Sequence, residues 1–172
     1  MEQIKKAIQF ITEKHVGQIR RDSKLPYITH PINVMNRLIS HNITDVDILV
    51  AALLHDTLED TDTTYDEIAD IFNDDIAELV HELTNDPNIT KADKLQYQLT
   101  KIPTISCEAQ LIKIADKIDN VLDFLLNCND SERIKNYINN TTELMEKIKD
   151  THHGLYLEYK NIINLEKNKT RL

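Results

Sequence analysis

The chain has 172 residues, of which 41% are hydrophobic, so it has the size of a single domain and can bury a core. Its formal net charge of −9 argues against a general nucleic-acid binder, which would present a basic face, but leaves room for a small anionic ligand in a local basic pocket. There is no signal peptide and no apolar stretch of about 18 residues, so we expect a cytoplasmic protein that does not enter a membrane, with Cys107 and Cys128 as reduced thiols.

The composition predicts an all-α fold. Only two Gly and four Pro occur, and runs in which β-branched residues alternate with polar ones are few. We expect one domain over 1–172, a bundle of about eight to ten helices, because neither a repeat nor a composition shift divides the chain. Its chemical motifs fall within about 5–150, and 151–172 are expected to form a C-terminal helix and tail.

Apolar residues at helical spacing place the helices in chain order. A polar loop at 17–29 separates the first two, the polar residues 85–88 interrupt the chain further on, and the tail after Lys167 is expected to fray. The predicted helices span 2–16, 31–40, 45–56, 65–72, 74–84, 90–101, 107–127, 132–150 and 152–167.

Residues that favour helix N-caps precede several of these segments. Thr29 or His30 is expected to cap the second helix, with Pro31 in its first turn, and Thr44 or Asp45 is expected to cap the third. The remaining predicted caps are Thr64, in a capping box with Glu67, then Ser106, and finally Asp130 or Ser131.

One stretch combines a buried helix with ionisable side chains. The apolar run 48–54 leads directly into His55 and Asp56, and the acids Glu59 and Asp60 follow. His55 and Glu59 are four residues apart, as are Asp56 and Asp60, so each pair would share a face if the helix continued. Because such groups are costly to bury without a partner, the stretch predicts a bound metal ion.

Two further residues complete the predicted ligand set. His30 lies upstream, and Asp116 interrupts the apolar face of the helix at 107–127. Two imidazoles and two carboxylates suit Mn²⁺, Fe²⁺, Co²⁺ or Zn²⁺ better than Ca²⁺. Four protein ligands would leave positions for water and a substrate oxygen, as metal-assisted hydrolysis requires. Taken singly, His30 also suits a helix cap, and Asp116 an ion pair with Lys113 or Lys117.

Four stretches, in chain order, carry a resemblance to a known protein family. They are His15-x-Gly17-Gln18-x-Arg20-Arg21, Pro26-Tyr27-Ile28-x-His30-Pro31, Ala51-Ala52-Leu53-Leu54-His55-Asp56-Thr57-x-Glu59-Asp60-Thr61-x-Thr63-Thr64 and Lys113-x-Ala115-Asp116-Lys117-x-x-Asn120. The chain resembles the HD superfamily of metal phosphohydrolases. More narrowly, it is similar to the hydrolase domain of the RelA/SpoT family in its small stand-alone form, the alarmone hydrolases. The continuation Glu59-Asp60-Thr61 distinguishes this group from other HD proteins.

The resemblance implies a role for each matching residue. Glu59 and Asp60 would position and deprotonate the attacking water. Arg20 and Arg21 would line the nucleotide pocket, one against the base and one toward phosphate. The ion, usually Mn²⁺, would be held by His30, His55, Asp56 and Asp116, and the pocket would be completed by Asn120 on the sugar or phosphate side and by Tyr137 as a closing group.

The resemblance also implies a reaction. The family removes the 3′-pyrophosphate from guanosine 3′,5′-bis(diphosphate), ppGpp, or from pppGpp, which gives GDP or GTP and pyrophosphate. Alternatives on the same site are a phosphatase acting on NADPH or another nucleotide phosphohydrolase. A different class is an HD module that binds nucleotide and metal without turnover, which the intact Glu59 and Asp60 argue against. A helical interaction protein would leave the buried His and Asp unexplained.

Two positions depart from the family pattern. Asp119 stands where an aromatic residue or His often precedes the Asn, and Leu122 replaces a usual Arg. The loop around Arg20 also differs slightly in length from that of common relatives. These departures bear on which nucleotide fits, and they leave the predicted ligands and acids in place.

Overall fold

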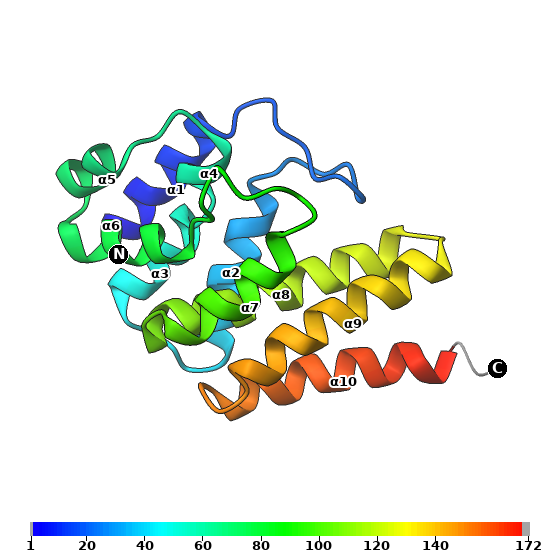
Figure 1. The fold of residues 1–172 in the computed structure, drawn as a ribbon. Helices are drawn as coiled ribbons and strands as arrows, with labels where there is room; N and C mark the ends of the chain where they lie inside the picture. The colour runs from blue at the N-terminus through cyan, green and yellow to red at the C-terminus, as the bar shows by residue number, and fades with distance from the viewer. Residues whose placement is uncertain (1, 170–172) are drawn as a thin grey trace.

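The computed structural model describes residues 2–169, and the regular elements in this range are all helices (Figure 1). Within these residues the structure contains ten α-helices, the shortest of them with four residues. The predicted all-α bundle of about eight to ten helices is therefore confirmed. Of the tail predicted after Lys167, residues 168 and 169 belong to the last helix, and 170–172 lie outside the described residues. The elements are α1 (Glu2–Lys14), α2 (Thr29–Ser40), α3 (Val46–Leu54), α4 (Thr57–Asp60), α5 (Tyr65–Ile71), α6 (Asp74–Leu83), α7 (Lys94–Lys101), the 3-10 helix η1 (Ile102–Thr104), α8 (Cys107–Asn127), α9 (Ser131–Lys147) and α10 (His153–Lys169).

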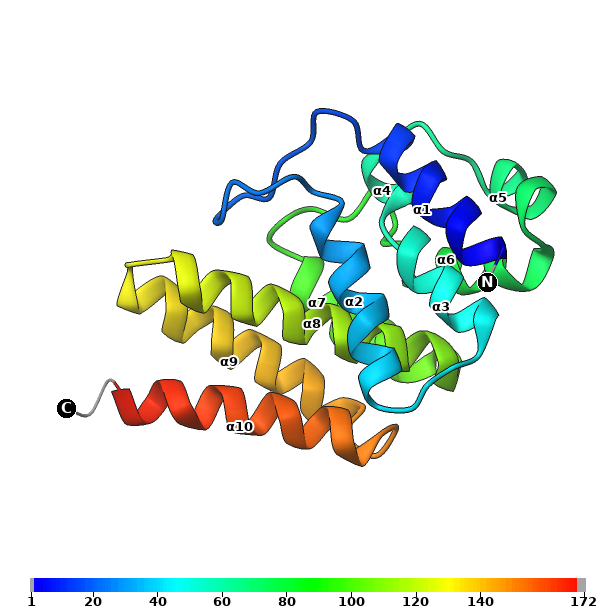
Figure 2. The same ribbon diagram turned by 180° about the vertical axis from the view of Figure 1, so that it is seen from behind.

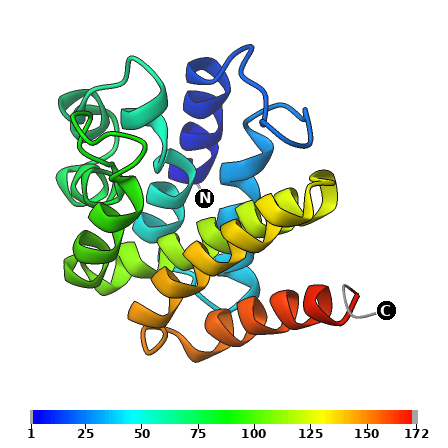
Figure 3. The ribbon, with the colours of Figure 1, turned by 45° about the vertical axis from the view of Figure 1, so that its right-hand side comes forward.

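Two groups of helices meet along α2, α3 and α8. On one side α1 packs against α3, and α5 packs against α6, which in turn contacts α3. On the other side α9 and α10 pack against α8, the longest helix, and the three run beside one another (Figures 1 and 2). Because α2 contacts both α3 and α8, it joins the two groups, and α1 and α10 lie on opposite sides of the molecule (Figure 3).

Helix α3 lies in the centre of the core. Every residue from Ile48 to Leu54 is buried, which is the pattern of a helix surrounded by other helices. Its neighbours are α1, α2, α6 and α8. The apolar run therefore delivers the following polar residues into the interior rather than to the surface. Within residues 2–169, no helix combines the length and apolar character that crossing a membrane would need.

The continuous helix predicted over 45–56 is wrong at its end. Helix α3 stops at Leu54, and His55 and Asp56 form a turn before the short α4. The unbroken helix that would have set His55 above Glu59 is therefore not formed. The turn matters for the site, because it lets the two residues at the break point toward α2 and α8.

The predicted helix caps are mostly confirmed. The cap predicted at Thr29 or His30 is wrong: α2 begins at Thr29, whose hydroxyl donates to the carbonyl oxygen of Pro26 at 2.8 Å. The other predicted positions accept hydrogen bonds from backbone N–H groups of their first turns, and the capping side chains are Asp45, Thr64, Ser106 and Asp130.

Two helices, α7 and α9, differ from the prediction by three or more residues at one end. Helix α7 begins at Lys94 rather than at 90, because Thr90 and Asp93 form a local turn in which the Thr90 hydroxyl donates to Asp93 at 2.6 Å. It then passes into η1, which contains Pro103. Helix α9 ends at Lys147, short of the predicted 150.

Candidate metal centre and adjoining pocket

Three of the predicted metal ligands meet where α2 begins and α3 ends. Oδ2 of Asp56 lies 3.0 Å from Nε2 of His55 and 3.6 Å from Nε2 of His30. One ligand atom from each of these residues lies within 4.8 Å of the other two. This spacing can hold one divalent metal ion between side chains from two separate segments.

Asp116 approaches the same group from the middle of α8. Its Oδ1 lies 3.3 Å from Nε2 of His30 and 3.9 Å from Nε2 of His55. Its Oδ2 lies 3.3 Å from Nζ of Lys113, so the ion pair left open by the sequence is formed on the side away from the imidazoles. Burial by itself would raise the pKa of Asp116, but the charges of Lys113 and Lys117 hold it well below its usual range. The carboxylate therefore stays ionised and can bind a cation.

Both imidazoles are oriented through their Nδ1 atoms. Nδ1 of His55 lies 2.8 Å from the carbonyl oxygen of Ala52, and Nδ1 of His30 lies 2.7 Å from Oδ2 of Asp119. Because these oxygens accept, each Nδ1 carries the hydrogen and each Nε2 faces the carboxylates of Asp56 and Asp116. Among the described residues, Nε2 of His55 is buried without a hydrogen-bond partner.

This donor set fits a divalent metal ion. A buried ring nitrogen without a hydrogen-bond partner is costly, and a cation placed between it and the carboxylates would remove that cost. Two imidazole nitrogens and two carboxylate groups suit the borderline first-row ions rather than Ca²⁺. The order of the ligands along the chain, one from α2, two from the turn after α3 and one from α8, is that of the sequence prediction.

Tyr27 belongs to the site although the sequence assigned it no role. Its hydroxyl donates to Oδ2 of Asp56 and lies 3.4 Å from Oδ2 of Asp60. Burial and the negative charge of Asp56 raise the pKa of Tyr27, so the hydroxyl keeps its proton and remains a donor. Tyr27 therefore bridges a predicted metal ligand and a predicted catalytic acid.

The side chains of the two predicted catalytic acids, Glu59 and Asp60, contact different neighbours. Oε1 of Glu59 lies 2.8 Å from Nζ of Lys94, and Oε2 accepts from Nδ2 of Asn85 at 2.6 Å. Burial by itself would raise the pKa of Glu59, but these two partners lower it. In contrast, burial and the charges of Asp56 and Glu59 raise the pKa of Asp60. The structure places Asp60 beside Tyr27, and Glu59 against Asn85 and the first residue of α7.

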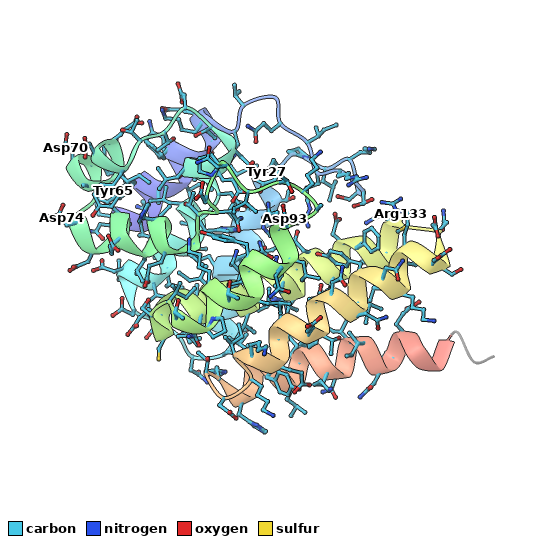
Figure 4. The ribbon with its side chains drawn as sticks, viewed as in Figure 1. Tyr27, Tyr65, Asp70, Asp74, Asp93 and Arg133 are labelled. Atoms are coloured by element: carbon cyan, nitrogen blue, oxygen red, sulfur yellow. The ribbon has the colours of Figure 1, made fainter. Side chains whose placement is uncertain are left out.

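A cavity of about 540 Å³ opens beside the predicted metal ligands. All four predicted substrate-binding residues line it, together with His30 and Tyr27, so the structure brings the predicted pocket and the predicted centre together. Figure 4 labels Tyr27, ahead of α2, and Arg133, in the first turn of α9, which line the cavity from different elements. The predicted members of its wall are Arg20, Arg21, Asn120 and Tyr137.

Arg20 is held firmly in the wall of this cavity. It is 6% exposed, and its guanidinium donates to Asp119, to Oδ2 of Asp123 at 3.1 Å and to Oδ1 of Asn120 at 3.1 Å. Arg21, next to it, is exposed. The ring of Tyr137 packs on Phe124, with 4.7 Å between ring centroids, so helix packing and pocket lining are combined in this residue.

Sequence reasoning missed three residues around the site. Asp119 follows Asp116 by one turn of α8, and this spacing is the signal that could have placed both on one face. Tyr27 lies three residues before His30 in a stretch already singled out. Lys94 had no local signal, because its partner Glu59 is 35 residues away along the chain.

Comparison with known proteins identifies the family. The sequence pattern of the HD domain family matches residues 7–144. A protein from Danio rerio, named guanosine-3′,5′-bis(diphosphate) 3′-pyrophosphohydrolase MESH1, is 37% identical over 155 residues, which cover 86% of this chain and 85% of the relative. The protein of the same name from Homo sapiens is 38% identical over 160 residues, covering 89% and 88%.

A solved structure agrees over almost the whole chain. It is described as a metazoan ortholog of SpoT that hydrolyzes ppGpp and plays a role in starvation responses. Its TM-score to this structure is 0.91, with 33% sequence identity over 96% of each chain. The match to the family pattern, the similar relatives and the shared fold agree, and the chain therefore belongs to the HD domain family and, within it, to the family of the MESH1 proteins.

Proposed function

We propose that this chain is a metal-dependent hydrolase that removes pyrophosphate from the 3′ position of ppGpp or pppGpp, with Mn²⁺ as its ion. The observation that carries the proposal is the cluster of the buried His30 and His55 with the half-buried Asp56, at the edge of a cavity lined by arginine and asparagine. Its support from relatives is that MESH1 proteins are named for this hydrolysis and that the structural neighbour is described as hydrolysing ppGpp.

The proposed ion site uses four side chains. When bound, a divalent ion supplies positive charge against the phosphoryl oxygens during hydrolysis. His30 and His55 would bind the ion through their Nε2 atoms, because their Nδ1 atoms already donate to Asp119 and to the carbonyl oxygen of Ala52. Asp56 and Asp116 present ionised oxygens to the same space.

The two acids would handle the attacking water in different ways. Asp60 has a raised pKa, which brings it closer to the range in which a carboxylate works well as a general base. Glu59 stays ionised beside Lys94 and would orient the water by accepting a hydrogen bond. Water attacks phosphorus, the bond from phosphorus to the 3′ oxygen breaks, pyrophosphate leaves, and the 3′ oxygen takes up a proton.

The cavity would hold the guanosine part of the substrate. Guanidinium groups stack on bases and bind phosphates with two parallel hydrogen bonds, which suits Arg20 and Arg21. Asn120 lies between Arg20 and the metal ligand Asp116, so it is placed to contact the sugar or the 3′ phosphates. Tyr137 would close the cavity from α9.

A product assay tests the proposal. The purified full chain, incubated with ppGpp, pppGpp and NADPH in separate reactions with Mn²⁺, should release pyrophosphate from the two guanosine nucleotides. Adding a chelator should abolish the release, and restoring Mn²⁺ should recover it. Asp56→Asn should reduce the amount of bound ion and the rate together, because it removes a ligand that touches both imidazoles.

Each other outcome of the assay would contradict a named part of the proposal. Release of inorganic phosphate from NADPH, with ppGpp left intact, would contradict the proposed substrate and leave the proposed metal site unchanged. Tight nucleotide binding without product would make the chain a binding module. Metal analysis that finds no divalent ion in the active protein would contradict the proposed metal centre. The cytoplasmic location expected from the sequence stays a prediction, which cell fractionation would check.

A further inference from the structure

Asp119 contacts both His30, a predicted metal ligand, and Arg20 in the cavity wall. It is 5% exposed on α8, and its carboxylate receives three donors from outside that helix. Oδ2 lies 2.7 Å from Nδ1 of His30 and also accepts from a terminal nitrogen of Arg20. Oδ1 accepts from Nδ2 of Asn33 at 3.0 Å. A carboxylate held by three donors has a fixed position, and so have the groups bonded to it.

We infer that Asp119 is a positioning residue that holds His30 for the metal ion and ties this ligand to Arg20 in the cavity wall. The inference rests on the metal centre of the proposed function. A carboxylate on the far nitrogen of a metal-binding imidazole fixes the ring and its tautomer and makes the ring a stronger ligand. The second imidazole, His55, has only the neutral carbonyl oxygen of Ala52 in the same position.

The bonds around Asp119 form a closed circuit. Arg20 donates to Asp119 through one terminal nitrogen and to Oδ1 of Asn120, at 3.1 Å, through the other. Asn120 in turn donates to Oδ1 of Asp116, and that oxygen lies 3.3 Å from Nε2 of His30. His30 closes the circuit through its Nδ1 contact with Asp119. Two predicted metal ligands and two predicted substrate-binding residues are thus fixed by a single network.

The need to neutralise the charge of Arg20 does not by itself explain why the carboxylate of Asp119 stands at this position. Arg20 already has a second acid, because its Nε donates to Oδ2 of Asp123 at 3.1 Å. His30, by contrast, has Asp119 as the acceptor for its Nδ1 hydrogen. Asp119 and Asp123 therefore share Arg20 and differ in their contact with His30, which makes Asp123 a matched control.

The test compares Mn²⁺ binding to the wild-type chain, Asp119→Asn and Asp123→Asn by titration calorimetry. Asp119→Asn should weaken Mn²⁺ binding by about 10- to 100-fold, the usual effect of removing an acid behind a ligand imidazole. Asp123→Asn removes the same charge next to Arg20 and should change the affinity by less than about threefold. Circular dichroism of each variant checks that the helices are retained.

The outcomes separate this inference from the proposed function. If Asp119→Asn binds Mn²⁺ as tightly as the wild type, or if Asp123→Asn loses as much affinity, the positioning role is overturned while the metal centre stands. If the wild type binds no Mn²⁺, the centre and the inference fail together. If the wild type does not cleave ppGpp but the variants show the expected difference in Mn²⁺ affinity, the proposed substrate is wrong and the role of Asp119 is supported.

A measurement on the wild-type chain covers the case in which Asp119→Asn does not fold. Nitrogen-15 spectra of the Zn²⁺-loaded protein should show His30 with a protonated Nδ1 whose hydrogen exchanges slowly, assigned by its loss in His30→Gln. A proton-free Nδ1 or a rapidly exchanging hydrogen on His30 would overturn the inference. Because this readout involves no substrate, it does not depend on activity.

Discussion

Neighbouring acids in this chain differ through their contacts, not through their residue types. Glu59 and Asp60 are adjacent, yet Lys94 and Asn85 lower the pKa of the first, whereas burial and nearby carboxylates raise the pKa of the second. Pairs of titratable groups whose pKa values are pushed apart are the usual basis for dividing catalytic roles. At the scale of the single residue, the charge of Glu59 and the proton on His30 can therefore each be tested.

Glu59→Gln should keep Mn²⁺ binding and lower kcat by about 10²- to 10⁴-fold, the range for losing an acid or base that acts on the reacting water. The amide keeps the shape of the side chain and removes its charge. Steady-state kinetics with ppGpp and calorimetry with Mn²⁺ measure the two effects. Glu108→Gln, on the exposed first turn of α8, is the matched control and should behave as the wild type. A wild-type rate in Glu59→Gln would contradict the role assigned to Glu59.

The affinity for Mn²⁺ should rise with pH up to about pH 9. Burial by itself would lower the pKa of His30, but Asp116 and Asp119 raise it to about 9, so at neutral pH a proton and the ion compete for Nε2. Displacing one proton increases the association constant by up to about tenfold per pH unit below that pKa. Calorimetry between about pH 6.5 and 8.5 measures the slope, and a flat profile would contradict the competition.

At the scale of the helix, the site depends on where α3 begins and ends. Asp45 starts the helix by accepting from the backbone N–H groups of Asp47 and Ile48, and the helix then runs through the core. The turn at its other end presents His55 and Asp56 to α2 and α8. The cap thus stabilises the element that carries two of the four predicted ligands.

Asp45→Ala should lower the free energy of unfolding by about 0.5–2 kcal/mol, the usual effect of losing an N-cap side chain. Asp45→Asn keeps an oxygen that accepts the same N–H groups, so its stability should stay close to that of the wild type. Urea denaturation followed by circular dichroism compares the three proteins. Equal losses in Asp45→Ala and Asp45→Asn would show that the charge matters and the cap does not.

At the scale of the whole molecule, the C-terminal helix is part of the same core. Leu155, Tyr159 and Ile163, spaced four residues apart on α10, are buried, and α10 packs against α8. The hydroxyl of Tyr159 lies 2.7 Å from that of Thr142 on α9. The predicted single domain over 1–172 therefore leads us to expect one cooperative unfolding transition.

Tyr159→Ala should lower the stability of the whole chain by about 3–5 kcal/mol, as for other large core side chains, with the transition still single. Leu157→Ala, at an exposed position of the same helix, is the control and should change stability little. Differential scanning calorimetry compares the calorimetric and van't Hoff enthalpies. A separate early transition in Tyr159→Ala would show that α10 unfolds on its own and would contradict the single domain.

Local patterns predicted the helices better than they predicted the site. The apolar run at 48–54 and the caps Asp45, Thr64, Ser106 and Asp130 are visible within a few residues of sequence, and the structure contains them. The break after Leu54 was missed, because the propensities of the following residues do not forbid a longer helix. Contacts with α2 and α8 favour the turn, and those contacts are not local.

By itself, the sequence determined the helical fold, the family and the residue types available to bind a metal ion. It determined these because periodicity, capping and motif order are properties of short segments. Only the tertiary structure decided that Glu59 turns to Lys94 while Asp60 stays beside Tyr27. It also decided that Asp119 supports His30 across 89 residues of chain, since such a bond depends on how α2 packs on α8.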